Sequence, residues 1–218
     1  MVEFRESDHT YWRLADAEGG YDPLSRTKLM GVSEAMGLVG MVDTTYFKEV
    51  HAVRGTFSHR ATALLDQGTL DDSTVDETVG AYLDCYKEFL ADCQPTWTRI
   101  EWLVACALTR CAGTIDRVGE ITVRGEKQPV ILDLKTGHAT STHPIQLAAY
   151  QHLVSAYLSR RGDPTGAVRL KRYALYLRKG KKYTLTPYSD PQDAAVWVSA
   201  LTCANWIAEH QPRRVSAY

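Results

Sequence analysis

Two carboxylates and a lysine have the spacing of a hydrolytic site. Asp133 and Lys135 lie two residues apart after the apolar run 130–132, and Asp116 lies 17 residues before Asp133 in the segment GTIDRVG. Side chains at positions i and i+2 of a strand point to the same face, so Asp133 and Lys135 project together while Leu134 packs on the other face. A connection of hairpin length joins the two predicted strands. The sequence therefore predicts that both carboxylates converge.

Converging carboxylates and a backbone carbonyl suit a hard divalent cation such as Mg²⁺ or Mn²⁺. The lysine can then orient an attacking water and stabilise the charge that develops on a phosphoryl group. The alternative is an ordinary Asp–Lys ion pair at a sheet edge. Because such a pair is costly to desolvate, its presence there favours a functional role.

Gln146 and Tyr150 extend this pattern. They lie four residues apart on a predicted helix, 145–160, which Pro144 precedes, so they share one face near the N-terminus of that helix. An amide, a phenol and the free N–H groups of a helix N-terminus are suited to phosphate oxygens. The alternative is an exposed glutamine and a partly packed tyrosine.

The elements GTID, DLK and QLAAY, in this order, resemble the PD-(D/E)xK nuclease superfamily, and most of all its RecB-like and phage lambda-exonuclease-like branch. The resemblance covers about residues 50–160. It implies an α/β (α+β) fold with a restriction-endonuclease-like core, in which helices flank a mixed central β-sheet. It also implies a DNA nuclease that uses Mg²⁺ or Mn²⁺.

The same resemblance implies roles for single residues. Asp116 and Asp133 match the metal-binding carboxylates, and the carbonyl of Leu134 is a further ligand. Lys135 matches the catalytic lysine. Gln146 and Tyr150 match the QxxxY element of this branch and are expected to contact DNA.

Two further segments complete the expected site. The stretch VRGTFSH, 53–59, resembles the RGTxxH element, in which the histidine is a metal ligand or contacts the substrate phosphate; here it is His59. An imidazole beside two carboxylates would favour Mn²⁺ as well as Mg²⁺. Arg54 is expected to hold phosphate. Glu101 lies where the family often has a strand glutamate, as a ligand of a second metal or as a partner of the first ligands.

The number and spacing of the five cysteines argue against disulfide bonds and a metal cluster. They form no CxxC pair, and only Cys203 follows the QxxxY element, so neither a disulfide framework nor the iron–sulfur cluster of some relatives is expected. No GxxxxGK[ST] loop is present, so an unwinding motor would be another chain. A helicase or a single-strand annealing protein is therefore the protein partner to consider, and the sequence leaves the oligomeric state open.

The elements that must position these residues follow from hydrophobic spacing. We expect one nuclease domain over 1–218, with an irregular arm over 1–50, a helical part over 51–92 and the catalytic core over 93–218. The arm has a short helix near 28–36, and the helical part has helices at 52–67 and from about residue 73. In the core we expect strands at 98–108, 111–123, 130–134, 169–178 and 183–187, and helices at 145–160 and 194–209.

Composition excludes disorder and a membrane span. The 218 residues are 44% apolar with net charge −1, and the longest apolar run, 102–108, is far too short to cross a bilayer. The charged N-terminus does not resemble a signal peptide, so we expect a soluble protein of the cytoplasm, that of the host if a phage encodes it.

The near-zero net charge hides an uneven distribution of charged residues along the chain. Residues 1–92 carry 17 acidic and 8 basic side chains, whereas residues 93–218 carry 9 and 17, which favours a polyanionic partner on one face. Seven cations fall in 169–182, on a predicted hairpin. This segment either follows a phosphate backbone or is a charged sheet edge that resists strand pairing.

The expected function is a metal-dependent DNA nuclease, and an exonuclease before a structure-specific endonuclease. Two alternatives are a DNA-binding or assembly module that has lost turnover, and a nuclease subunit that is active only with a partner. The clustered carboxylates argue against the pure binding module, because they repel phosphate unless a metal neutralises them.

Overall fold

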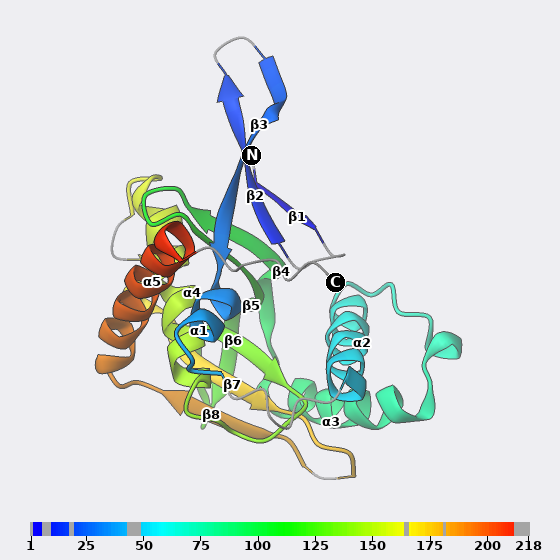
Figure 1. The fold of residues 1–218 in the computed structure, drawn as a ribbon. Coiled ribbons are helices and arrows are strands. Elements are labelled where there is room, and N and C mark those ends of the chain that lie inside the picture. The colour runs from blue at the N-terminus through cyan, green and yellow to red at the C-terminus, as the bar shows by residue number, and fades with distance from the viewer. Residues whose placement is uncertain are drawn as a thin grey trace.

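The structure is a computed structural model that describes residues 2–5, 10–17, 20–42, 49–163, 166–180 and 182–211. A mixed β-sheet lies between two groups of helices (Figure 1). The strands are β1 (Val2–Arg5), β2 (Thr10–Ala17), β3 (Gly20–Gly31), β4 (Thr96–Cys106), β5 (Cys111–Val123), β6 (Glu126–Lys135), β7 (Lys171–Tyr176) and β8 (Thr184–Tyr188). The α-helices are α1 (Val32–Leu38), α2 (Glu49–Asp66), α3 (Glu77–Cys93), α4 (His143–Ser159) and α5 (Gln192–His210), and short 3₁₀ helices cover Asp72–Thr74 and Gly166–Arg169. This is the α/β architecture that the sequence predicts.

The central strands combine hairpins with one crossover. β4 and β5, β5 and β6, and β7 and β8 pair antiparallel, as neighbours along the chain. β6 and β7 pair parallel, because α4 carries the chain back between them. Their register places Lys135 opposite Tyr176, so the ends of β6 and β7 lie at the same edge of the sheet.

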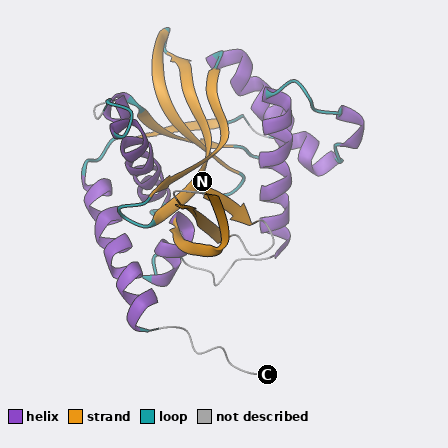
Figure 2. Ribbon diagram, turned by 90° about the horizontal axis from the view of Figure 1, so that it is seen from above, coloured by secondary structure: helices purple, strands orange, loops and turns teal. Residues whose placement is uncertain are grey.

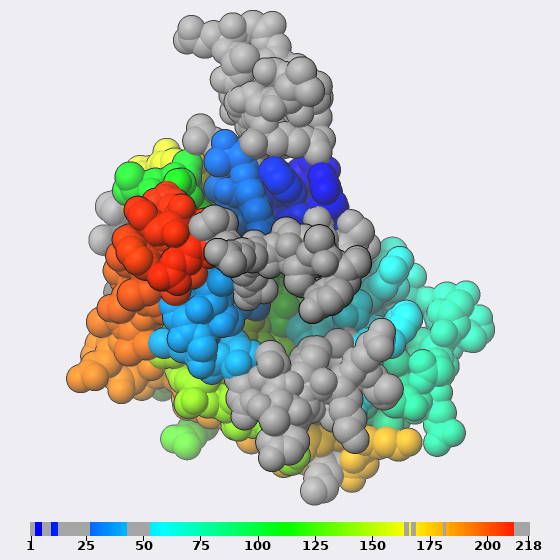
Figure 3. Space-filling model, viewed as in Figure 1, coloured from blue at the N-terminus to red at the C-terminus, as the bar shows by residue number. Residues whose placement is uncertain are grey.

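Alternation along β6 divides the core between the two faces. Val130, Leu132 and Leu134 pack under α3, whereas Ile131 belongs to the larger cluster with α1, α4 and α5. Asp133 and Lys135 have the parity of Ile131 and therefore face α4. The views along and across the sheet show α4 and α5 on one side and α2 and α3 on the other (Figures 1 and 2). In the space-filling view α5 lies at the left of the molecule and α2 and α3 lie at the right (Figure 3).

The expected arm over 1–50 is not irregular where the structure describes it. β1, β2 and β3 form antiparallel pairs, and β3 joins the central sheet through two parallel pairs, Met30 with Cys111 and Gly31 with Ala112. The helix expected at 28–36 begins only at Val32, because residues 28–31 still belong to β3. The N-terminal residues thus extend the sheet rather than wrapping over it.

The other expected elements differ mainly at their ends. The helix expected from residue 73 starts at Glu77, because Asp76 is its N-cap and its carboxylate accepts hydrogen bonds from the N–H groups of Thr78 and Val79. The strand expected at 98–108 is β4, two residues earlier. The strand expected at 169–178 is shorter, since residues 166–169 form a 3₁₀ helix. In the described part of the chain, no helix has both the length and the apolar character of a membrane span.

Candidate active site

The site forms where β5 and β6 separate. Their backbone pairing ends at Arg117 and Leu132, and beyond this point the N–H of Leu134 donates instead to Oδ2 of Asp116, at 2.6 Å. The N–H and C=O of one residue in a strand point to the same side, so the Leu134 carbonyl also faces the opening between the strands. Asp116 is 5% exposed and Asp133 1%. Both carboxylates are therefore fixed by the sheet rather than carried on a loop.

Asp133 and Lys135 project together, as the spacing predicts. Lys135 Nζ lies 2.6 Å from Asp133 Oδ2 and donates to Oε1 of Gln146 on α4, at 2.8 Å. Gln146 Nε2 in turn donates to the hydroxyl of Tyr150, at 2.9 Å. Gln146 and Tyr150 thus share a face and converge on the lysine. In this arrangement their side chains orient Lys135, and Tyr150 is buried, with 6% of its surface exposed.

Gly113 allows α4 to approach this closely. A Cβ at position 113 would lie 3.1 Å from Cε1 of Tyr150 and 3.1 Å from a methyl carbon of Val32. A larger residue would push α4 away from β5. The glycine of the GTID element therefore sets the distance between the sheet and the helix that carries Gln146.

His59 and Glu101 complete a cluster around Asp116. His59, on α2, places Nδ1 3.3 Å from Oδ1 of Asp116. One potential ligand atom from each of His59, Glu101 and Asp116 lies within 4.8 Å of the other two. Glu101 comes from β4, in which Ile100 pairs with Arg117 and Trp102 with Ile115, so Glu101 lies directly across from Asp116.

Glu101 has an unusual backbone conformation. Its φ is +46°, in the left-handed region that a residue with a Cβ rarely adopts. This conformation costs roughly 1–2 kcal/mol. Strain of this kind persists only when surrounding contacts impose it, and it is concentrated at functional sites.

Burial and neighbouring charges shift the pKa values of the groups in the cluster. Burial raises the pKa of Asp133 to about 6, against the attraction of Lys135. Burial and the charge of Asp116 raise the pKa of Glu101 to about 7. Burial lowers the pKa of His59, but the charge of Asp116 outweighs it and raises the value to about 8. Burial opposes ionisation of Asp116 as well, yet the charge of His59 and their hydrogen bond lower its pKa.

These groups fit a hard divalent cation. The donors are carboxylate oxygens and one imidazole nitrogen. Mg²⁺ prefers the oxygens, whereas Mn²⁺ binds both the oxygens and the nitrogen. Among the described residues, no hydrogen bond of regular geometry reaches the buried Oδ2 of Asp133; its contact is the ion pair with Lys135. A cation among these carboxylates would offset the burial and the charge of Asp116, which together raise the pKa values of Asp133 and Glu101.

Arg54 lies at the border of this site. Its Nη2 donates to the carbonyl of Thr136, at 3.4 Å, and its guanidinium lies 5.6 Å from the centre of the Tyr82 ring. Nε of Arg54 is buried without a hydrogen-bond partner among the described residues. The arginine is thus held beside the residue that follows Lys135.

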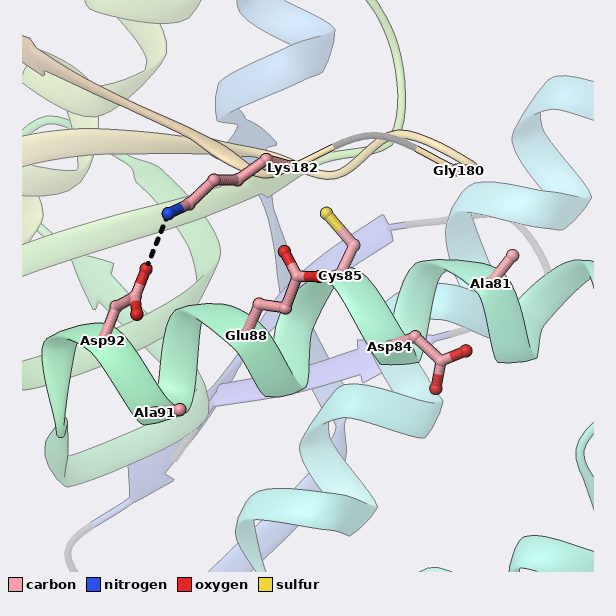
Figure 4. A pocket seen from close by; sticks show the side chains of 8 residues that line it. All are labelled: Ala81, Asp84, Cys85, Glu88, Ala91, Asp92, Gly180 and Lys182. Carbon is pink, nitrogen blue, oxygen red and sulfur yellow. Dashed lines mark ion pairs between the residues drawn. The ribbon is translucent and has the colours of Figure 1, made fainter.

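The seven cations of 169–182 were predicted either to follow a phosphate backbone or to form a charged sheet edge, and several of those that the structure describes are engaged by carboxylates. Arg172 is buried and pairs with Asp193 at 3.0 Å. Lys182 pairs with Asp92 of α3 at 3.2 Å, across a pocket of about 590 Å³ (Figure 4). Lys179 lies 3.9 Å from Glu77, and Lys181 lies outside the described residues. Because β8 is the last strand of the sheet, the segment matches the charged-edge interpretation better.

Arg117, whose guanidinium is fully buried beside the site, was not predicted as a site residue from the sequence. It contacts Glu101 and the backbone of Asp116 on one side and Asp66 of α2 on the other. Arg117 directly follows Asp116, the last residue of the GTID element, and this position could have indicated a role in the site. Strict alternation, however, would place the two side chains on opposite faces of the strand. Both in fact contact α2, so the alternation of β5 is interrupted at this point.

A comparison with protein families matches residues 88–216 to the PD-(D/E)XK nuclease superfamily. A search of curated proteins found no significant match. Among solved structures, a candidate exonuclease from Eubacterium rectale is similar over 80% of this chain and 77% of its own, at 11% identity and a TM-score of 0.50. The crystal structure of SSO0001 aligns over 86% of this chain and 81% of its own, at 14% identity and a TM-score of 0.38, which is too low to compare folds. The first similarity extends to the fold alone.

Proposed function

The chain belongs to the PD-(D/E)XK nuclease superfamily, and on this premise we propose that it is a metal-dependent deoxyribonuclease that degrades DNA from its ends. The observation that carries the proposal is the meeting of Asp116, Asp133 and Lys135 where β5 and β6 separate. We further propose that the elements from β1 to α5 act as one nuclease domain, because β3 connects the N-terminal strands to the central sheet.

Asp116, Asp133, His59 and the Leu134 carbonyl are the proposed metal ligands, with Glu101 as a further one. When bound, Mg²⁺ or Mn²⁺ would act as a Lewis acid on the scissile phosphate and lower the pKa of a water molecule. The chain contributes a fixed set of oxygens for this purpose, since Asp116 is held by the Leu134 N–H and by His59.

Lys135 is the proposed catalytic residue for the attacking water. Its ammonium has three N–H donors, and Asp133 and Gln146 engage two of them. The third N–H is available to orient a water or to donate to a phosphate oxygen. Gln146 and Tyr150 keep the ammonium at this place, and Arg54 is the proposed contact to the phosphate on the outer side.

The choice of an exonuclease rests on the resemblance to the RecB-like and phage recombination nucleases, and the assignment of the Eubacterium rectale protein agrees with it. A role in phage-type recombination or repair follows from the same resemblance. The second candidate is a structure-specific endonuclease. A module that binds DNA without cleaving it is disfavoured, because the clustered carboxylates of Glu101 and Asp116 would repel phosphate without a metal.

The test is cleavage of end-labelled linear DNA and of closed circular DNA with Mg²⁺, with Mn²⁺ and with EDTA. We expect metal-dependent loss of the linear substrate only, and loss of this activity in Lys135→Ala. Lys127→Ala is the matched control, because Lys127 lies on the same strand and is exposed. Cleavage of circles would favour the endonuclease. DNA binding without cleavage under every condition would refute the proposal.

A further inference from the structure

Arg117 joins the candidate metal cluster to the buried interior. Its guanidinium has no exposed surface. Nη1 donates to Oε1 of Glu101 at 3.0 Å and to the backbone carbonyl of Asp116 at 2.7 Å, so the two protons of one nitrogen tie the side chain of β4 to the backbone of β5. The guanidinium thus fixes one oxygen of Glu101 and leaves the other available to the cluster with His59.

The opposite side of the guanidinium is anchored to α2 and α3. Nε donates to Oδ2 of Asp66 at 2.6 Å, and Nη2 donates to Oγ1 of Thr62 at 3.2 Å. The hydroxyl of Tyr86 donates to the same Asp66 oxygen at 2.7 Å. Asp66 is nearly as buried as Arg117, with 3% of its side chain exposed. This pairing stabilises the arginine charge and fixes the plane of the guanidinium.

The strained backbone of Glu101 shows that its position is imposed. Its left-handed φ directs the residue away from the regular alternation of β4. Among the described residues, the hydrogen bond that reaches its carboxylate comes from Arg117. A ligand in a strained conformation needs such a hold to keep its place.

We propose that Arg117 is a positioning residue, which holds the carboxylate of Glu101 against His59 and Asp116 so that all three can ligate one divalent cation. The inference rests on the proposed function, since it assigns a task to a residue beside the proposed metal ligands. Partners that orient ligands in this way change metal affinity by 10- to 100-fold when they are removed.

The substitution Arg117→Lys distinguishes the positioning of Glu101 from simple stabilisation of the fold. Arg117→Lys keeps a cation opposite Asp66, but a single ammonium cannot reproduce the planar group that reaches Asp66 and Glu101 together. Arg117→Met removes the cation altogether. A purely structural arginine predicts that lysine restores both stability and metal binding. A positioning arginine predicts that lysine restores stability only.

The experiment is a titration with Mn²⁺ alone, with free Mn²⁺ measured by electron paramagnetic resonance, together with urea unfolding in EDTA. We expect Arg117→Lys, Arg117→Met and Glu101→Gln each to weaken Mn²⁺ binding about tenfold or more. The double variant Arg117→Lys/Glu101→Gln is expected to bind no more weakly than the weaker single variant. Tyr86→Phe is the control: it loosens the same network on the far side of Asp66, so it lowers the urea midpoint and leaves Mn²⁺ affinity within twofold.

Wild-type affinity in folded Arg117→Lys, or additive losses in the double variant, would overturn the inference. Unchanged binding in Glu101→Gln would also overturn it, because no ligand would then need positioning. If neither variant at position 117 folds, Thr62→Val decides: it removes one hydrogen bond from the guanidinium and should weaken Mn²⁺ binding more than Tyr86→Phe does. Cleavage by the wild type, measured in parallel with Mg²⁺ and with Mn²⁺, reports on the proposed function separately, whereas a wild type that binds no Mn²⁺ overturns the inference alone.

Discussion

Replacing Glu101 with glutamine is expected to stabilise the metal-free protein while it lowers DNA cleavage. The carboxylate has a pKa of about 7 in the folded protein and about 4.5 when unfolded, because burial and the charge of Asp116 disfavour its ionised form. Between these values the folded state binds more protons, so the contribution of Glu101 to stability falls as the pH rises from 4.5 to 7. A shift of 2.5 units corresponds to about 3.4 kcal/mol. Since 35% of the side chain is exposed, we halve this to about 1.7 kcal/mol at pH 8, and to about 0.4 kcal/mol at pH 5.

Urea unfolding in EDTA at both pH values measures this difference. Glutamine keeps the size of the side chain and the strained backbone, so the comparison isolates the charge. Glu120→Gln, an exposed carboxylate on β5, serves as the control and should change stability little at either pH. A Glu101→Gln variant that is less stable than the wild type at pH 8, or a difference that is the same at pH 5 and pH 8, would refute this account of the electrostatics.

Three further outcomes are expected. Gly119→Ala should cost about 3 kcal/mol in urea unfolding, because its Cβ would lie 2.2 Å from the backbone oxygen of Thr96; a loss under 1 kcal/mol would contradict that packing. Burial and the charge of Lys135 lower the pKa of His143 to about 4, so the wild type should lose stability as the pH falls from 6.5 towards 4. At pH 5, His143→Gln should lose about 1 kcal/mol less unfolding free energy than the wild type does. An equal loss in both proteins would mean that the imidazole is not buried in its neutral form. Mg²⁺ or Mn²⁺ at 100 times its dissociation constant should raise the unfolding free energy by about 2.7 kcal/mol in a thermal melt, and Asp133→Ala should abolish the gain; an equal gain in that variant would place the metal elsewhere.

Alternation in β6 was sufficient to predict its part of the site. The run 130–134 is buried on both faces, so the two polar residues that interrupt and follow it had to share one face, and they do. The helix signal of Pro144 likewise predicted that Gln146 and Tyr150 share a face. Their contacts with Lys135 were not predictable, because they depend on the crossover that brings α4 over the end of β6.

The N-terminal strands and the surroundings of Glu101 could not be predicted in this way. β1, β2 and β3 belong to a paired ribbon whose glycines, charges and proline mask a period of two. A glutamate gives no indication of a left-handed φ such as that of Glu101, because glycine or asparagine is the usual signal for this conformation. Arg117 is buried by partners on α2 and α3, more than 30 residues away along the chain, and no local pattern indicates such partners.

The hydrogen bond from the Leu134 N–H to Asp116 also bears on how this chain can change during evolution. The carboxylate replaces a backbone acceptor at the point where two strands part, so it contributes to the sheet as well as to the site. Selection for folding therefore continues to favour an oxygen at position 116 after selection for cleavage has ended. A descendant that binds DNA without cutting it is expected to lose Lys135 first and to retain aspartate or asparagine at 116.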